Sequence, residues 1–258
     1  MLNRKLDLLY WVFKHTKKLD LFYYFYKIIK YRNVAKAQEM FYWKNQLKYS
    51  PEVFSCGDLY HREDDISFAL KSIESTFNVS GKNIKVLEIG PGPKSNLIPW
   101  YDKGVFDLIG VDPLANDYKR ELDGGSFLLS GLGEEVDTLF SHNSFHMVYS
   151  SNALDHCQDP HKVVAGVFQV LKPQGLFIVC GNEREGSRVF WQGFHQHDLW
   201  LESNNLLHSD KNKNISILID DEEFSLVNKR DLIYDWQGNK IKWFLGTWKK
   251  GSLKYFKK

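Results

Sequence analysis

The chain has 258 residues, of which 43% are hydrophobic and 26% are charged, so it can bury one sizeable core, and the disordered and fibrous classes are excluded. The formal net charge is only +2, which excludes a protein that coats nucleic acid by neutralising phosphates. The three cysteines have no CxxC or metal-ligand spacing. They predict neither a disulfide framework nor a zinc site, and they fit a reducing, cytoplasmic location.

Positive charge is concentrated near the N-terminus, where residues 1–50 contain eleven basic and three acidic residues. Apolar residues recur at near-helical intervals over 2–31, which predicts two amphipathic helices. A further helix is predicted over 64–77, so residues 1–80 are interpreted as an N-terminal helical extension. Two interpretations of its basic aromatic part stay open: a cap that closes over the site, or peripheral contact with the inner face of the membrane.

Residues 81–258 have the pattern of an α/β domain. Short apolar runs separated by helical spacers predict five strands of a doubly wound, mostly parallel sheet with helices on both faces. The runs are 84–89, 106–111, 126–129, 145–150 and 176–180. Ligands of such a sheet bind beyond the carboxyl ends of the strands, at the topological switch point. The residues that follow each run are therefore the candidates for a site.

The segment after the fifth predicted strand indicates further β-structure. Alternating apolar residues on either side of a turn at 203–205 predict a β-hairpin insertion of about 182–212. The tail predicts three more strands, 224–227, 231–234 and 241–248, with a turn at 237–239. Residues 215–219 fit a strand or a helix equally well.

Small and acidic residues follow the predicted strands in an order that suits a nucleoside ligand. Gly90 and Gly92 form a turn after the first strand, where glycine lets the backbone approach a ligand and present its N–H groups. Asp112 ends the second strand, where a carboxylate can accept hydrogen bonds from ribose hydroxyls. A tight turn in any α/β protein can also contain such glycines, so the order of the motifs matters more than the turn.

Five segments in this order resemble the motifs of the class I S-adenosylmethionine-dependent methyltransferases. They are residues 88–92, Asp112, 131–135, 152–156 and 171–175. The resemblance covers about 84–180 and implies a Rossmann-like methyltransferase domain at 81–258 with S-adenosyl-L-methionine as its cofactor. The cofactor-binding residues that it implies are Glu88, Gly90, Pro91, Gly92, Asp112, Pro113, Leu132, Glu134 and Asn152.

Histidines after the fourth and fifth strands are the candidate catalytic residues. A hydroxyl acceptor must lose its proton to a base, and histidine titrates near neutrality. The resemblance places His156 on the acceptor side of the cofactor, although it could also pack at the start of a helix. His195 and His197, two residues apart, could bind substrate or metal from one strand face or could line a solvated face. Glu183 and Arg184 are similarly placed to meet a polar acceptor, and no metal is predicted.

The predicted function is S-adenosylmethionine-dependent O-methylation of a hydroxyl on a sugar or lipid-linked glycan, as part of polysaccharide biosynthesis. The expected partner is a sugar, a glycan or another small hydroxyl-bearing acceptor, and no nucleic acid is expected. Methylation of a small molecule or a quinone-like lipid is the alternative within the same class. Because Pro93, Leu132 and His146 depart from the family pattern, an inactive cofactor-binding scaffold is the alternative from another class.

Overall fold

The computed structural model describes residues 59–251 except 192, 221–223 and 237–238, together with residues 39, 40, 42, 43 and 47. Contacts divide the chain into two compact units, Met1–Pro51 and Glu52–Lys258. The helices predicted over 2–31 lie outside the described residues, and so do the cap and membrane interpretations. Within the described part, no helix has the length and hydropathy needed to cross a bilayer.

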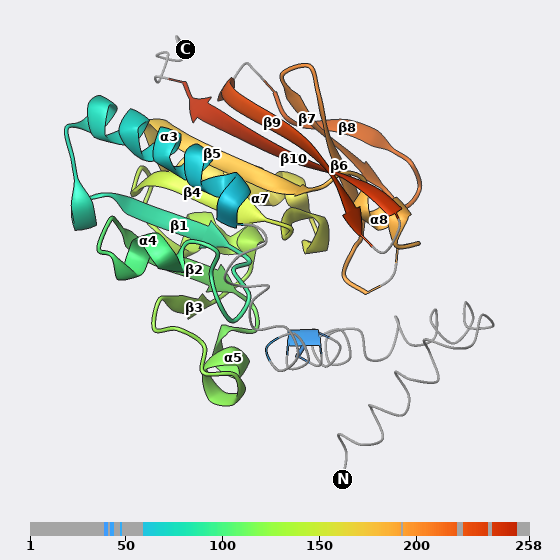
Figure 1. The fold of residues 1–258 in the computed structure, drawn as a ribbon, viewed down its shortest axis with the longest axis horizontal. Helices are drawn as coiled ribbons and strands as arrows, with labels where there is room; N and C mark the ends of the chain where they lie inside the picture. The colour runs from blue at the N-terminus through green and yellow to red at the C-terminus, as the bar shows by residue number, and fades with distance from the viewer. Residues whose placement is uncertain are drawn as a thin grey trace. The chain divides into compact units, whose positions relative to one another are not determined.

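The second unit has an α/β fold (Figure 1). Its helices are α3 (Leu59–Phe77), α4 (Ile98–Asp102), α5 (Ala115–Glu121), α6 (Val136–Leu139), α7 (Pro160–Val170) and α8 (Glu185–Arg188), with the 3-10 helices η2 (Gly81–Asn83), η3 (Gly133–Glu135) and η4 (Leu154–His156). Its strands are β1 (Lys85–Ile89), β2 (Asp107–Asp112), β3 (Leu128–Ser130), β4 (Phe145–Ser151), β5 (Leu171–Asn182), β6 (His197–Glu202), β7 (Asn205–Asp210), β8 (Ile215–Ile219), β9 (Phe224–Trp236) and β10 (Asn239–Lys250).

Seven strands form the central sheet, in the order β3-β2-β1-β4-β5-β10-β9. Strand β1 pairs in parallel with both β2 and β4, so the strand order reverses between β1 and β4, and the topological switch point lies there. Strand β10 runs antiparallel to both of its neighbours, β5 and β9. The doubly wound, mostly parallel sheet predicted from the sequence is confirmed.

Helices cover both faces of this sheet. Helices α3 and α7 both contact β5, and they lie on opposite faces of the sheet (Figure 1). Ile66, Ala69 and Ile73 of α3 are buried at helical spacing along one stripe. On the other face, Val163 and Val167 of α7 are buried in an apolar cluster with residues of β1, β4 and β5. The central strands are therefore covered on both sides, and the ligand site is left to the ends of the strands.

Helix α3 is bound to the far edge of the sheet by polar contacts. The buried Asp65 accepts a hydrogen bond from Asn228 Nδ2 at 2.9 Å and lies 3.4 Å from the guanidinium of Arg230. Both partners belong to β9. The helix, which the sequence pattern grouped with the extension of residues 1–80, thus packs within the second unit.

Helix α7 follows η4 in the chain and is capped at both ends. The Asp159 carboxylate accepts hydrogen bonds from two backbone N–H groups of the first turn, and Pro160 occupies the first helical position. At the other end, the ammonium of Lys250 donates to the carbonyl oxygens of Phe168 and Leu171 at 2.5 and 2.6 Å. A cation at this end complements the helix dipole. The caps hold α7, and with it the preceding segment, in place.

Strand β5 differs from its prediction. It begins at Leu171 rather than Leu176, and its register against β4 jumps from Phe145–Leu171 to Met147–Leu176. Residues 172–175 bulge out of the strand, with Gln174 at φ 67°. The motif segment 171–175 therefore lies inside β5 and contains a bulge.

The segments after β5 also differ from the prediction. The predicted hairpin is two strands of a three-stranded sheet, β6-β7-β8, so the insertion extends beyond 212 to include 215–219 as a strand. The predicted strands 224–227 and 231–234 are one continuous strand, β9. The residues between them, 228–230, include no glycine or proline that would end a strand.

Candidate functional site

The turns after β1 and β4 touch at the switch point. Gly90 has φ 67°, and a Cβ built there would lie 2.4 Å from Cβ of Ala153, so a larger residue would push the two turns apart. Gly92 also has φ 67°. Its N–H donates to Asp112 Oδ2 at 3.1 Å, and the N–H of Leu114 donates to Asp112 Oδ1 at 2.8 Å. These contacts hold a buried carboxylate at the carboxyl end of β2, beside the glycine turn.

Glu88 stabilises the same turn from inside the protein. Its side chain is 1% exposed and accepts a hydrogen bond from the Ser95 hydroxyl. The Ser95 oxygen in turn accepts from the N–H of Leu97 at 2.8 Å. Pro91, within the turn, is buried as well, whereas Pro113, which follows Asp112, is exposed.

Glu134 and Asn152 each accept backbone hydrogen bonds from a distant segment. Glu134 Oε1 accepts hydrogen bonds from the backbone N–H groups of Gln158 and Asp159, at 2.7 and 3.2 Å. Asn152 has φ 48°, and its Oδ1 accepts from the N–H of Asn182 at 3.1 Å, which links the ends of β4 and β5. Glu134, one of the residues that the resemblance assigns to cofactor binding, thus fixes the segment between η4 and α7, and the half-buried Leu132 lies two residues before it.

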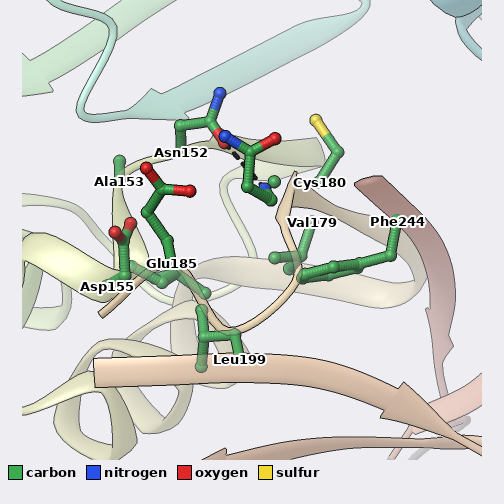
Figure 2. Close-up of a pocket in the computed structure, with 11 residues that line it drawn as sticks. Asn152, Ala153, Asp155, Val179, Cys180, Glu185, Leu199 and Phe244 are labelled. Carbon is green, nitrogen blue, oxygen red and sulfur yellow. Dashed lines mark hydrogen bonds between the residues drawn. The ribbon is translucent and has the colours of Figure 1, made fainter. Parts of the chain in front are cut away.

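A pocket opens at the carboxyl ends of β4 and β5 (Figure 2). Ala153 lines it, so the pocket adjoins the contact between the two turns. Two carboxylates, Asp155 and Glu185, line it among mostly apolar groups. The lining residues are Asn152, Ala153, Leu154, Asp155, Val179, Cys180, Gly181, Asn182, Glu185, Leu199 and Phe244.

Asp155 is also the centre of a cluster with two histidines. Its Oδ2 lies 2.6 Å from His195 Nδ1 and 3.5 Å from His156 Nε2, and these two nitrogens are 3.0 Å apart. Asp155 and His156 belong to η4, whereas His195 precedes β6. The N–H of Gln196 donates to the carbonyl oxygen of Asp155 at 2.9 Å, and the ring of Phe194 stacks on His156. The fold thus brings together two of the three predicted catalytic histidines.

The environment of Asp155 favours its ionised form. Burial alone would raise its pKa, but the neighbouring His156 and the hydrogen bond from His195 outweigh burial and hold the pKa below its usual value. Sequence reasoning did not select Asp155 as a functional residue. The available signal was an acid directly before a histidine, just past the end of a strand.

His197 belongs to a second network. The carbonyl oxygen of Cys157 can only accept, so His197 Nε2 carries the proton and donates to it at 2.9 Å. Nδ1 of the neutral ring therefore accepts from His208 Nε2 at 2.8 Å. The same reasoning makes the Ser216 hydroxyl the donor to His208 Nδ1 at 3.1 Å and the acceptor from His161 Nε2 at 2.9 Å. Each group in this series of hydrogen bonds thus has one donor or acceptor role that agrees with its neighbours.

The rings at the centre of this second network are held neutral. Burial lowers the pKa of His197, and burial together with the neighbouring histidines lowers the pKa of His208 to about 4. Both nitrogens of His197 are hydrogen-bonded and its ring is buried, so it joins the small sheet to the segment after η4. The structure therefore separates His197 from His195, with which the sequence pattern grouped it.

The two residues after β5 are held by contacts within the protein. Glu183 forms an ion pair with Lys242 at 2.6 Å, and the guanidinium of Arg184 lies 3.9 Å from the centre of the Trp200 ring. His146, which departs from the family pattern, has a pKa lowered to about 4 by burial and by the charges of Lys172 and Lys85.

Comparisons with known proteins were consistent with the site. Residues 87–179 match the family model described as a methyltransferase domain. A sterol 24-C-methyltransferase of Aspergillus fumigatus is 34% identical over 104 residues, which cover 38% of this chain and 28% of that protein. A ribosomal RNA large subunit methyltransferase E of Caulobacter vibrioides is 28% identical over 130 residues, covering 43% of this chain and 55% of that protein. The chain thus spans about a quarter and about half of the length of these two relatives.

Solved structures show only a weak overall likeness. An S-adenosylmethionine-dependent methyltransferase from Methanosarcina mazei is 15% identical, with a TM-score of 0.47, over 69% of this chain and 97% of that chain.

Proposed function

Since residues 87–179 form a class I methyltransferase domain, whose cofactor is S-adenosylmethionine, we propose that the protein methylates a hydroxyl oxygen of a sugar or lipid-linked glycan. One observation carries this proposal. The turn of Gly90 and Gly92 is bonded to Asp112 and touches Ala153, and Ala153 lines the same pocket as Asp155, which contacts two histidines. A cofactor half-site and an acceptor half-site would thus be adjacent.

The residues at the switch point fit the cofactor. Gly92 has φ 67° and donates its N–H to Asp112, so the turn after β1 and the carboxylate at the end of β2 lie together, as a nucleoside ligand would require. Asp112 would accept hydrogen bonds from the ribose hydroxyls, and Leu132 would lie against the adenine. When bound, the cofactor supplies an electrophilic methyl carbon on a sulfonium sulfur. The protein then has to align the acceptor with that carbon and exclude water.

The cluster at Asp155 would supply the base. The carboxylate accepts a hydrogen bond from the N–H at His195 Nδ1 and so fixes the orientation of that ring. A histidine of the cluster, His156 or His195, would take the proton of the acceptor hydroxyl as the oxygen attacks. Asp155 would stabilise the imidazolium that forms. His197 is instead assigned to holding the small sheet in place.

Calorimetric titration with S-adenosylhomocysteine tests the cofactor half-site. We expect Asp112→Asn to weaken binding at least tenfold, because a neutral amide is a poorer partner for ribose hydroxyls. The matched control is Asp107→Asn, which changes an exposed aspartate at the opposite end of the same strand and should bind like the wild type. Absence of binding by the wild type at millimolar ligand would contradict the proposal.

Transfer of a labelled methyl group into cell extract tests the acceptor half-site. We expect label in glycan or glycolipid fractions, released by glycosidases and stable to mild alkali, since an O-methyl ether resists the hydrolysis that cleaves a methyl ester. Label in nuclease-sensitive material would replace the sugar by RNA, the acceptor type named for the Caulobacter relative. Label in other small molecules or lipids would favour the alternative acceptor class.

A further inference from the structure

We propose that Asp155, His156 and His195 form a binding site for one divalent transition-metal ion of the zinc, manganese or iron type. Metal binding is an activity beyond methyl transfer, and the geometry of these three side chains supports it. Neither the cysteine spacing nor the sequence pattern predicts this site.

The distances between the three ligand atoms suit a common ion. His156 Nε2, His195 Nδ1 and Asp155 Oδ2 are separated by 2.6, 3.0 and 3.5 Å. Nitrogen and oxygen ligands lie about 2.0–2.2 Å from a zinc ion, which places neighbouring ligands about 3.0–3.5 Å apart. One ion can therefore contact all three atoms with side-chain adjustments of a few tenths of an ångström. Two imidazoles and one carboxylate are also a common donor set for these metals.

Hydrogen bonding alone satisfies the cluster poorly. His195 Nδ1 lies within hydrogen-bonding distance of both Asp155 Oδ2 and His156 Nε2, but a ring nitrogen carries at most one proton. When that proton is donated to the carboxylate, His156 Nε2 can give a proton of its own only to the same Asp155 oxygen, over 3.5 Å, so one carboxylate oxygen has to serve both rings. A cation among the three atoms uses a lone pair from each of them.

The second network provides the contrast within the same molecule. In the chain through His197, His208 and Ser216, every nitrogen and oxygen has one donor or acceptor role that agrees with its neighbours. That network has no convergence of three ligand atoms. Among the side chains that the structure describes, the group of Asp155, His156 and His195 is the one where three such atoms lie within 4.8 Å of one another.

The surroundings would hold the ligands in place and admit an ion. The Asp155 side chain is 8% exposed, whereas His156 and His195 are each 28% exposed, so the cluster can be reached from solvent. The backbone contact between Gln196 and Asp155 fixes the loop that carries His195. Three protein ligands leave coordination positions for water or for an acceptor oxygen. If the proposed function holds, such an ion would take the place of the histidine base, because His156 Nε2 and His195 Nδ1 would then be ligands, and it would lower the pKa of an acceptor hydroxyl in the adjoining pocket.

The test uses the full chain, treated with a chelator, dialysed and titrated with Zn²⁺ alone, in the absence of cofactor and acceptor. We expect one ion per chain with a dissociation constant in the micromolar range or below, and visible absorption bands when Co²⁺ replaces Zn²⁺. His156→Asn and His195→Asn should each weaken binding at least tenfold. The matched control is His161→Asn, which removes an exposed histidine of the second network and should leave metal binding unchanged.

Two results would overturn the site: no stoichiometric ion in the wild type, or undiminished binding in both variants that retain wild-type circular dichroism. Because both histidines are partly exposed, these variants should fold even where Asp155→Asn does not. S-adenosylhomocysteine binding is measured on the same preparations. Metal binding without cofactor binding would refute the proposed function alone, and the reverse result would refute the metal site alone.

Discussion

Two histidine networks contact the short segment 155–157. They differ in whether every donor in the network has a matching acceptor. Around His197 and His208, protons and lone pairs alternate from the Cys157 carbonyl to His161, and the central rings are neutral. Around Asp155, three atoms that can bind a metal lie within 4.8 Å of one another. A network in which every donor has an acceptor, here called the closed network, contributes stability. The group around Asp155 instead has atoms that a ligand can still bind. The same residue type therefore has opposite uses a few residues apart.

Removal of the carboxylate should break this comparison most strongly. We expect Asp155→Asn to lower the rate of methyl transfer by about a hundredfold or more, the contribution typical of a general base or its partner. Labelled-methyl assays at saturating cofactor measure the loss, and Asp107→Asn serves as the control of equal charge change. Wild-type rates in Asp155→Asn would remove this cluster from the reaction.

Disruption of the closed network should affect stability instead. We expect His208→Leu to lower the free energy of unfolding by about 2 kcal/mol, because Nδ1 of His197 and the Ser216 hydroxyl lose their partner. Chemical denaturation measures the change. His142→Leu, at an exposed position, should be neutral by comparison. Zinc and S-adenosylhomocysteine binding should persist in folded His208→Leu, and their loss would show that the two networks are coupled.

Acid should destabilise the closed network over a defined pH range. The pKa of His208 is about 4 in the folded protein, against an ordinary value of 6.5, so the unfolded chain binds more protons between these pH values. The free energy of unfolding should therefore fall as pH falls from about 6.5 to about 4, by about 3 kcal/mol from this residue. His146 has the same shift and should add a similar decrease.

Denaturation curves collected across this pH range, for the wild type and His208→Asn, provide the measurement. The variant should lose the part of the pH dependence that comes from His208, whereas the part from His146 should remain. An unchanged slope in the variant would assign the acid sensitivity to other groups.

The exposed end of the closed network should have the smallest effect. His161→Asn removes one hydrogen bond to Ser216 at the surface, and we expect a loss of about 0.5 kcal/mol in the free energy of unfolding. Thermal denaturation of matched samples detects such a change. A loss as large as that of His208→Leu would mean that the network acts as one unit rather than as separate bonds.

The sequence predicted those parts of the structure that depend on local pattern. Strand periodicity predicted the five central strands, and the turn at Gly90 and Gly92 agrees with the positive φ of both glycines. The continuous β9 was not predicted, because the polar residues at 228–230 break the apolar alternation without ending the strand. Polarity there reflects contacts such as that between Asn228 and Asp65, which are made only in the folded protein.

The convergence at Asp155 could not be derived in the same way. Asp155 and His195 are 40 positions apart, and the loop that carries His195 is placed by the small sheet and by backbone contacts. Equally, nothing local distinguishes His195 from His197, although one joins Asp155 and the other joins His208. Spacing on a strand predicts a shared face only where the strand includes both residues, and β6 begins at His197.

The position of β10 has a consequence for synthesis on the ribosome. This strand pairs with β5 on one side and β9 on the other, although about sixty residues of chain separate it from β5. Until residues 239–250 have emerged, the nascent polypeptide keeps one edge of β5 unpaired, and α7 lacks the cation that Lys250 places at its C-terminal end. An unpaired apolar strand edge is prone to aggregation. A ribosome that stalls before this point would therefore hold a chain in need of a chaperone.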